Sequence, residues 1–270
     1  MARLQARPDL PLWVGFGVYT LACFLLFTWI RFPYDALRPR MENALARNLG
    51  LEVSLGHVRP SLTGGLVVEG VRMHENPVAK KVSISPRPWE AFRGVVGLGF
   101  RAELASGSLE GRARIPYRKG SRPLDVVLDM REMDLAAFGE VFPPATRPKG
   151  SVSGEIRLAA VGGAIDRSAG SVNLSWKKGS IPLNMPSLPF DALVFETLDL
   201  EGGIQGGQLT LDRGEFTGEF SGTFTGSVRL GKDARRTRLN ITGEINIPDS
   251  VRASLGPAAP PPGQAAKFSL

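Results

Sequence analysis

One strand pattern recurs along this chain and constrains its fold more than any other feature of the sequence. Residues 216–230 show it most clearly, because polar or charged side chains alternate there with apolar side chains and glycines. The apolar positions are Phe216, Gly218, Phe220, Gly222, Phe224, Gly226, Val228 and Leu230. Period-2 alternation places all of them on one face of a strand. Three phenylalanines four residues apart would also suit a helix, but the interleaved glycines and threonines make a helix costly, so we predict a strand.

The same alternation recurs elsewhere in the chain. Its other segments are 51–55, 66–73, 108–115, 151–158, 223–230 and 240–247. Their spacing is irregular, which indicates a recurring type of strand and not a fixed-period solenoid. The 32 glycines and 21 prolines suit short strands joined by turns. We therefore predict a mainly β fold, with an elongated, curved and mostly antiparallel β-sheet domain. Glycines on an apolar face permit curvature, or close approach of an aromatic ring, another layer or an apolar ligand.

A charge-free apolar segment precedes the strands. It runs from Leu10 to Ile30 and is long enough, at about 1.5 Å per residue, to span the roughly 30 Å hydrocarbon core of a bilayer. Trp13 and Trp29 lie near its ends, where membrane anchors place aromatic side chains. A cleavable signal peptide would have a shorter apolar core and small residues before a cleavage site. We therefore expect a single, uncleaved transmembrane helix.

The expected organisation has four parts. These are a cytoplasmic tail at 1–9, a transmembrane anchor at 10–30, a β-rich domain at 31–255 and a flexible Pro/Ala-rich tail at 256–270. Several arginines follow the anchor, so the positive-inside count does not favour a cytoplasmic N-terminus, but long translocated domains partly escape that rule. We expect the short N-terminal tail inside and the large domain outside.

A short helix is expected at about 35–49, directly after the anchor. Asp35 would cap its N-terminus and Gly50 would end it. An apolar residue recurs every fourth position, at Leu37, Met41, Leu45 and Leu49. We expect this stripe to pack on the first strands. Alternatively, the helix lies on the membrane surface with its arginines near lipid phosphates.

The sequence contains no motif for catalysis, cofactor binding or metal binding. Its two histidines, His57 and His74, stand apart in early strand regions, and its one cysteine, Cys23, lies in the apolar segment. No nucleophile elbow, P-loop or zinc-protease motif occurs. We therefore expect no enzymatic activity, catalytic residue, cofactor or metal, and we expect Trp89 and Trp176 to be packing residues. The net charge of +7 is spread singly among the strands, which argues against nucleic-acid binding.

Taken in order along the chain, several short motifs resemble the protein N family of the bacterial type II secretion system. They are the anchor, the helix ending in Gly50, residues 66–73, Ile181–Phe190, Gly207–Leu211, Gly231–Asp233 and the strand around Gly243. The N-terminal part also resembles AsmA-type proteins, which share an anchor and an elongated β-sheet. The resemblance implies a single-pass inner-membrane protein with its C-terminal domain in the periplasm. It also implies an accessory role in moving folded proteins across the outer membrane.

Two functions remain as expectations. The first is a non-enzymatic component that contacts other secretion-system proteins of the inner membrane and periplasm through its β domain. The second is an AsmA-like lipid-binding or lipid-transfer protein, in which the apolar face of residues 216–228 forms a groove for a lipid ligand. A closed core on that face would favour the first function, and an open groove wide enough for an acyl chain would favour the second.

Overall fold

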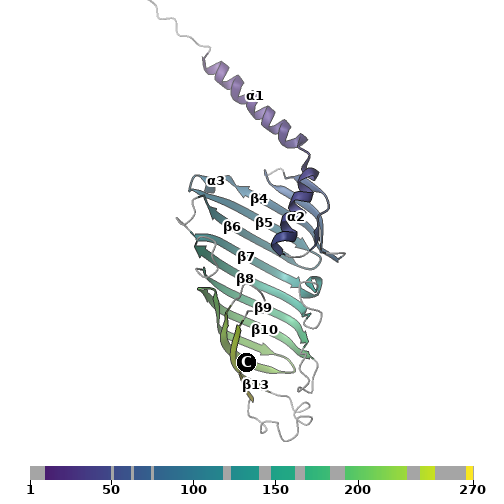
Figure 1. The fold of residues 1–270 in the computed structure, drawn as a ribbon, viewed down its shortest axis with the longest axis vertical. Helices are drawn as coiled ribbons and strands as arrows, with labels where there is room; N and C mark the ends of the chain where they lie inside the picture. Colours follow the sequence, from purple (N-terminus) through teal and green to yellow (C-terminus); the bar gives the residue numbers. More distant parts are fainter. Residues whose placement is uncertain are drawn as a thin grey trace, which may run out of the picture.

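The computed structural model describes residues 10–49, 52–61, 64–73, 76–117, 123–139, 147–161, 168–182, 192–229, 238–246 and 266–269. Its main feature is one antiparallel sheet of 14 strands, stacked along the long axis of the molecule (Figure 1). The order is β1-β3-β4 and then each strand in sequence to β14, with β2 paired to β3. The prediction of a mainly β, antiparallel fold is confirmed.

The strands have the following bounds. They are β1 (Val53–Ser54), β2 (Val58–Pro60), β3 (Leu66–Met73), β4 (Asn76–Arg87), β5 (Val95–Leu104), β6 (Ser108–Pro116), β7 (Pro123–Asp134), β8 (Lys149–Val161), β9 (Ser168–Pro182), β10 (Ala192–Gln205), β11 (Gln208–Thr217), β12 (Ser221–Arg229), β13 (Arg238–Asn246) and β14 (Ala266–Ser269).

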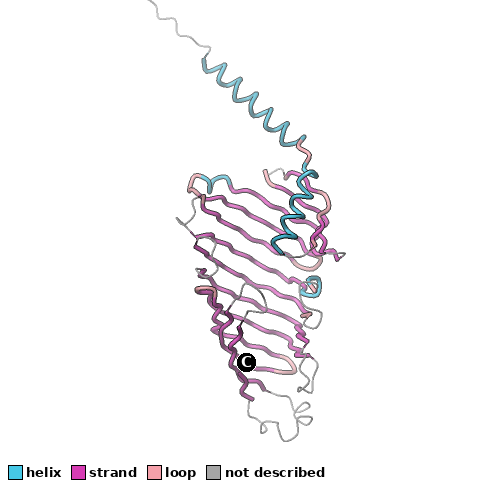
Figure 2. The backbone as a smooth tube through the Cα atoms, in the orientation of Figure 1, coloured by secondary structure: helices cyan, strands magenta, loops and turns pink. Residues whose placement is uncertain are grey.

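Most of the helical structure lies at the N-terminal end of the sheet (Figure 2). It consists of α1 (Leu10–Arg31), the 3-10 turn η1 (Tyr34–Leu37), α2 (Arg38–Leu49) and the single turn α3 (Pro88–Ala91). A second 3-10 turn, η2 (Leu135–Phe138), follows β7. Counting the described residues alone, no helix is both long and apolar enough to cross a membrane.

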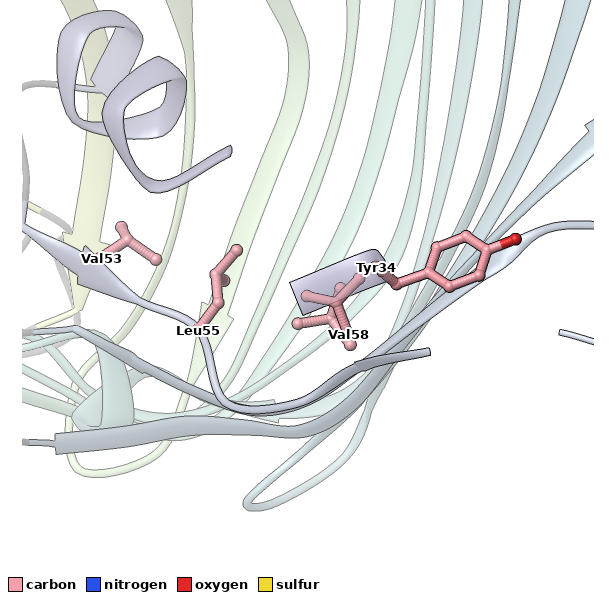
Figure 3. Close-up of a cluster of buried hydrophobic side chains, with 5 residues drawn as sticks. Tyr34, Val53, Leu55 and Val58 are labelled. Carbon is pink, nitrogen blue, oxygen red and sulfur yellow. The ribbon is translucent and has the colours of Figure 1, made fainter. Parts of the chain in front are cut away.

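The apolar stripe, which begins at Leu37 of η1 and continues along α2, packs on the first strands, as we expected from the sequence. Leu37, Met41 and Leu45 contact a buried cluster of Tyr34, Val53, Leu55, Val58 and Val68, most of which Figure 3 shows. A side-chain contact also ties α2 to this region, because the Leu55 N–H donates to Glu42 Oε1 at 2.8 Å. The side chain of Leu49 and the whole of Gly50 lie outside the described residues.

The predicted N-cap at Asp35 is wrong. The residue that precedes the first helical turn is Pro33, so Asp35 lies inside η1 and no side chain caps that turn. Its carboxylate instead accepts a hydrogen bond from the Val58 N–H at 3.3 Å, which ties η1 to β2.

Most of the alternating segments are strands. Segments 66–73, 108–115 and 151–158 lie within β3, β6 and β8, whereas only Val53–Ser54 of segment 51–55 is a strand. The single strand predicted over 216–230 is wrong, because the chain reverses at Gly218–Phe220 between β11 and β12. Gly218 has a φ of +138°, which favours glycine, and a Cβ there would lie 2.7 Å from the Glu196 nitrogen.

The C-terminal segment differs in part from the predicted flexible tail. Residues 266–269 form β14, which pairs with β13 in antiparallel register. The reason is that the outer edge of β13 offers backbone groups that a further extended segment satisfies. The rest of the predicted tail, 256–265 and Leu270, lies outside the described residues.

Candidate functional site: the apolar face of the sheet

The strand register sorts the side chains of the sheet onto two faces of opposite character. On the first face, directly opposed residues form transverse rows that contain only apolar side chains and glycine. One row is Ile84, Phe100, Gly111, Leu128, Ile156, Val172, Gly202 and Leu211. A second is Leu98, Ala113, Val126, Leu158, Gly170, Ile204, Leu209 and Val228. We call this surface the apolar face.

The opposite surface is polar. One of its rows is Ser83, Arg101, Glu110, Asp129, Glu155, Asn173, Glu201 and Arg213. Arg101 and Glu110 form an ion pair at 2.9 Å, and a hollow of about 680 Å³ extends over these strands. The hollow is lined by charges of both signs, and two of its ion pairs are Arg101–Glu110 and Arg157–Glu155, so it has no clear preference for a charged ligand. Exposed pairs of this kind contribute little to stability and keep this face in contact with water.

Buried side chains close the apolar face at its two ends. At the N-terminal end the cluster around Val68 lies under η1 and α2. At the C-terminal end a second cluster contains Phe195, Leu198, Phe216 and Phe220. Along one side, Phe138 of η2 packs on a third cluster, made of alanines and a leucine from β4 and β5.

The middle of the apolar face is less covered. Its side chains on β6 to β9, such as Leu128, Ile156 and Leu158, are half-buried. Within the part of the chain that the structure describes, all strands belong to one sheet and no second layer lies over these rows. A sheet whose apolar face has no covering layer of its own leaves an extended apolar surface available to a ligand or partner.

An apolar hollow of about 530 Å³ joins this face to the base of α1. Thr28 and Phe32 line it from the end of α1 and the connection that follows. Ile84 and Leu98 line it from the first two transverse rows of the apolar face. The apolar surface is therefore continuous from the base of α1 onto the sheet.

Phenylalanine rings lie over glycines that are directly opposite them on neighbouring strands. The pairs are Phe100 over Gly111, Phe195 over Gly179, Phe216 over Gly222 and Phe224 over Gly214. A Cβ built on these glycines would lie between 2.0 and 2.8 Å from the nearest ring atom. The absence of a Cβ at these glycines therefore lets the neighbouring rings pack against the strand, which is one of the roles predicted for them from the sequence.

The predicted apolar residues of 216–228 divide between two strands and a turn. Phe216 and Phe220 are buried, and Phe224 packs against them with its ring centroid 6.4 Å from that of Phe216. Gly222 lies opposite Phe216, while Gly226 and Val228 lie opposite Leu211 and Leu209 in the apolar rows. Gly218 is exposed at the turn and is not part of the face.

The apolar rows of β5 to β10, which make up most of the face, were not predicted from the sequence. A signal was present, because Leu124, Val126, Leu128 and Met130 alternate with other residues in β7. The packing role of Trp176 is confirmed, since its ring meets the Phe195 ring edge-to-face at 5.0 Å and its Nε1–H donates to the Lys149 carbonyl. The packing role of Trp89 is wrong, because its side chain is exposed on α3.

The other predicted positions add no chemistry to this face. Trp13 is exposed on α1, and the side chain of Trp29 lies outside the described residues. His57 is exposed, and His74 also falls outside the described ranges. Among the described residues, no group of three or more His, Cys, Asp or Glu side chains is placed to hold a metal ion.

No family model, curated protein or solved structure matches this chain. Its function is therefore inferred from its residue patterns and the geometry of the sheet.

Proposed function

We propose that this protein is a membrane-anchored, non-enzymatic β protein that holds lipid acyl chains on the apolar face of its sheet. The observation that favours this function most is the uninterrupted run of apolar rows from β5 to β9 with half-buried side chains. Exposing apolar surface to water costs about 25 cal/mol per Å². An acyl chain lying along the rows would remove that contact without needing a single polar partner.

The proposal includes α1 as the membrane anchor. The helix has 22 residues, about 33 Å at 1.5 Å per residue, and no charged residue occurs from Leu10 to Ile30. Its described apolar side chains, such as Trp13, Phe16 and Phe27, are exposed. The charge-free segment is continuous in the sequence through the residues whose side chains lie outside the described set.

The apolar hollow at the base of α1 provides a path for lipid between the bilayer and the apolar face. If α1 spans a bilayer, the hollow between Phe32 and Leu98 lies next to the membrane surface. An acyl chain would then pass from the bilayer onto the apolar face without crossing water. The resemblance given above suggests the bacterial inner membrane, with residues 1–9 in the cytoplasm and the sheet in the periplasm.

A second candidate function is that of an accessory component of type II secretion. The ordered resemblance favours it; of its motifs, 66–73 is β3, 208–211 is the start of β11, and Gly243 lies in β13. The short strands β1 and β14 at the margins of the sheet would provide edges for strand addition by other secretion-system proteins. The two functions are compatible, because a lipid would occupy the face and a partner protein the edges.

Photo-crosslinking in membranes tests the lipid function. Cells that express the full chain are fed a fatty acid with a photoreactive diazirine and an alkyne, and the crosslinked peptides are identified by mass spectrometry. We expect crosslinks on β5 to β9 in addition to those on α1. Leu128→Asp, in the middle of the face, should abolish the sheet crosslinks and leave those on α1.

Val127→Asp is the matched control, since Val127 lies on the same strand but lines the polar hollow. It should retain both sets of crosslinks. Crosslinks confined to α1 in the wild-type chain, or equal loss in the two variants, would refute lipid binding on the face. For the secretion function, deletion of the gene in its host should leave folded secretion substrates in the periplasm, and normal secretion would rule it out.

A further inference from the structure

An exposed aromatic turn stands at one corner of the sheet. The turn α3 connects β4 to β5, and the side chains of Trp89 and Phe92 are 78% and 89% exposed. Val96 and Ile115 are a directly opposed pair at the adjoining strand tips and are also exposed. Tyr117 completes the group, and its N–H donates to the Gly94 carbonyl at 3.2 Å. We call these five residues the α3 patch. Several large apolar side chains exposed at one corner of the sheet indicate an interaction surface.

The turn that presents the patch is held firmly by a carboxylate. Glu90 lies between Trp89 and Phe92 in the chain, but its side chain is only 13% exposed. It accepts a hydrogen bond from Arg114 Nε at 3.1 Å, and Arg114 also contacts Asp125 at 3.4 Å. These contacts hold Glu90 on the polar side of β5 and β6. They fix the conformation of the turn, and in this conformation Trp89 and Phe92 are exposed.

The patch lies at the end of the sheet from which α1 departs (Figure 1). The apolar hollow extends from α1 toward the patch, since Thr28 of α1 lines it together with Pro86 and Leu98. Pro86 lies two residues before α3, and Leu98 lies two residues after Val96. Aromatic side chains with nearby arginines, here Arg87 and Arg93, are typical of surfaces that bind at the headgroup level of a membrane.

We propose that the α3 patch inserts into the headgroup region of the same membrane that α1 spans. This inference rests on the proposed function, because lipid lies at this end of the sheet only if α1 is an anchor. Two points of attachment fix the orientation of the sheet, whereas α1 alone would leave it free to swing. The hollow between the two attachments is then held against the lipid surface.

A depth measurement on the full chain tests the insertion. The native Cys23 is replaced by serine, and Ala91→Cys places one environment-sensitive dye on α3 while Trp89 and Phe92 stay unchanged. The protein is reconstituted into vesicles of phosphatidylcholine and phosphatidylglycerol in a 7:3 ratio. Glu219→Cys, in the exposed turn between β11 and β12, is the matched control at the far end of the sheet. We expect blue-shifted emission and quenching by shallow spin-labelled lipid at position 91, and neither at position 219.

The test separates this inference from the anchor on which it depends. In the otherwise unchanged chain, Cys23 reports on α1, because an inserted helix shields it from a water-soluble maleimide until detergent is added. A shielded Cys23 with equal dye emission at 91 and 219 would overturn the insertion of α3 and leave the anchor standing. A Cys23 that reacts in intact vesicles would overturn both.

A charge variant tests whether the aromatic residues are responsible. Trp89→Glu with Phe92→Glu, in the Ala91→Cys protein, should shift the emission at 91 to that of the control position. Both side chains are exposed, so the thermal unfolding of the sheet should stay unchanged. Emission that remains blue-shifted in this variant would refute the role assigned to the two aromatic side chains.

Discussion

The packing of phenylalanine rings directly over glycines predicts that Gly179→Ala lowers the stability of the fold. Phe195 is 2% exposed, and its ring lies over Gly179 on the neighbouring strand. A Cβ at residue 179 would lie 2.0 and 2.2 Å from two ring atoms, well inside van der Waals contact. The ring has no free direction in which to move, because Trp176 meets it edge-to-face and Leu198 and Phe216 belong to the same buried cluster.

The expected cost follows from overpacking. Adding a methyl group to a filled core costs about 1–3 kcal/mol. For a chain of this size each kcal/mol lowers the melting temperature by about 2–4 °C, so Gly179→Ala should lower it by roughly 2–12 °C. Gly203→Ala is the control, because a Cβ there would meet nothing closer than the Gly170 carbonyl oxygen at 4.0 Å. It should be neutral, or stabilise by up to about 1 kcal/mol by restricting the unfolded chain.

The assay is thermal unfolding of the full chain in a mild detergent, followed by circular dichroism in the far ultraviolet. A third variant shows whether the ring is the cause. In a Phe195→Ala background the added methyl group of Gly179→Ala should cost almost nothing, because the ring is gone. Equal melting temperatures for Gly179→Ala and Gly203→Ala would refute the packing of the Phe195 ring over Gly179. A loss of stability from Gly179→Ala that persists in the Phe195→Ala background would refute it as well.

Two further predictions concern the stability of the folded chain, the first measured by thermal unfolding and the second by unfolding in urea. Phe220→Asp places a charge in a site that is 3% exposed and should lower the free energy of unfolding by several kcal/mol. Ser221→Asp, at the half-buried start of β12, should lower it by less than about half a kcal/mol, and equal losses would contradict the burial of Phe220. The hydrogen bond from the Leu55 N–H, with a smaller effect of Arg38, lowers the pKa of Glu42 below its ordinary value. Because the folded pKa is the lower one, the stabilisation is present above about pH 4 and is lost as the pH falls through the folded pKa. Glu42→Gln should therefore lower the urea midpoint of unfolding at pH 6. Between pH 6 and pH 3 the midpoint of the variant should decrease less than that of the wild type, and equal decreases would exclude Glu42 as the cause.

The type of fold could be predicted because alternation is a local signal. Residues 108–115 and 151–158 each place apolar side chains on one face, whichever strands they pair with. The reversal between β11 and β12 could not be predicted in the same way. Phe216 lies opposite Gly222 in the hairpin, so the even positions stay on one face on both sides of the turn. A hairpin with this register has the same alternation as one long strand.

The candidate site was harder to predict than the fold. The apolar rows join residues of at least eight strands, and no single segment reveals which residues oppose each other. The exposure of Trp89 was missed for a related reason. Its place on α3, at the end of the sheet from which α1 departs, depends on how β4 and β5 lie relative to the N-terminal helices, and aromatic residues are buried in most other contexts.

The arrangement of closed and open regions on the apolar face limits what could occupy it. A sheet with one apolar face is stable only when another layer covers that face. The chain supplies its own cover at the ends, with Leu45 of α2 at one and Phe216 and Phe220 at the other. An occupant of the middle must therefore reach it from an open margin, and the hollow lined by Phe32 and Leu98 is an apolar route from the base of α1. A second protein would have to fit a surface whose described rows consist of apolar side chains and glycine, which offer no polar side chains with which to fix its register. An acyl chain needs no such groups, so the geometry favours lipid on the face and leaves the strand edges for protein partners.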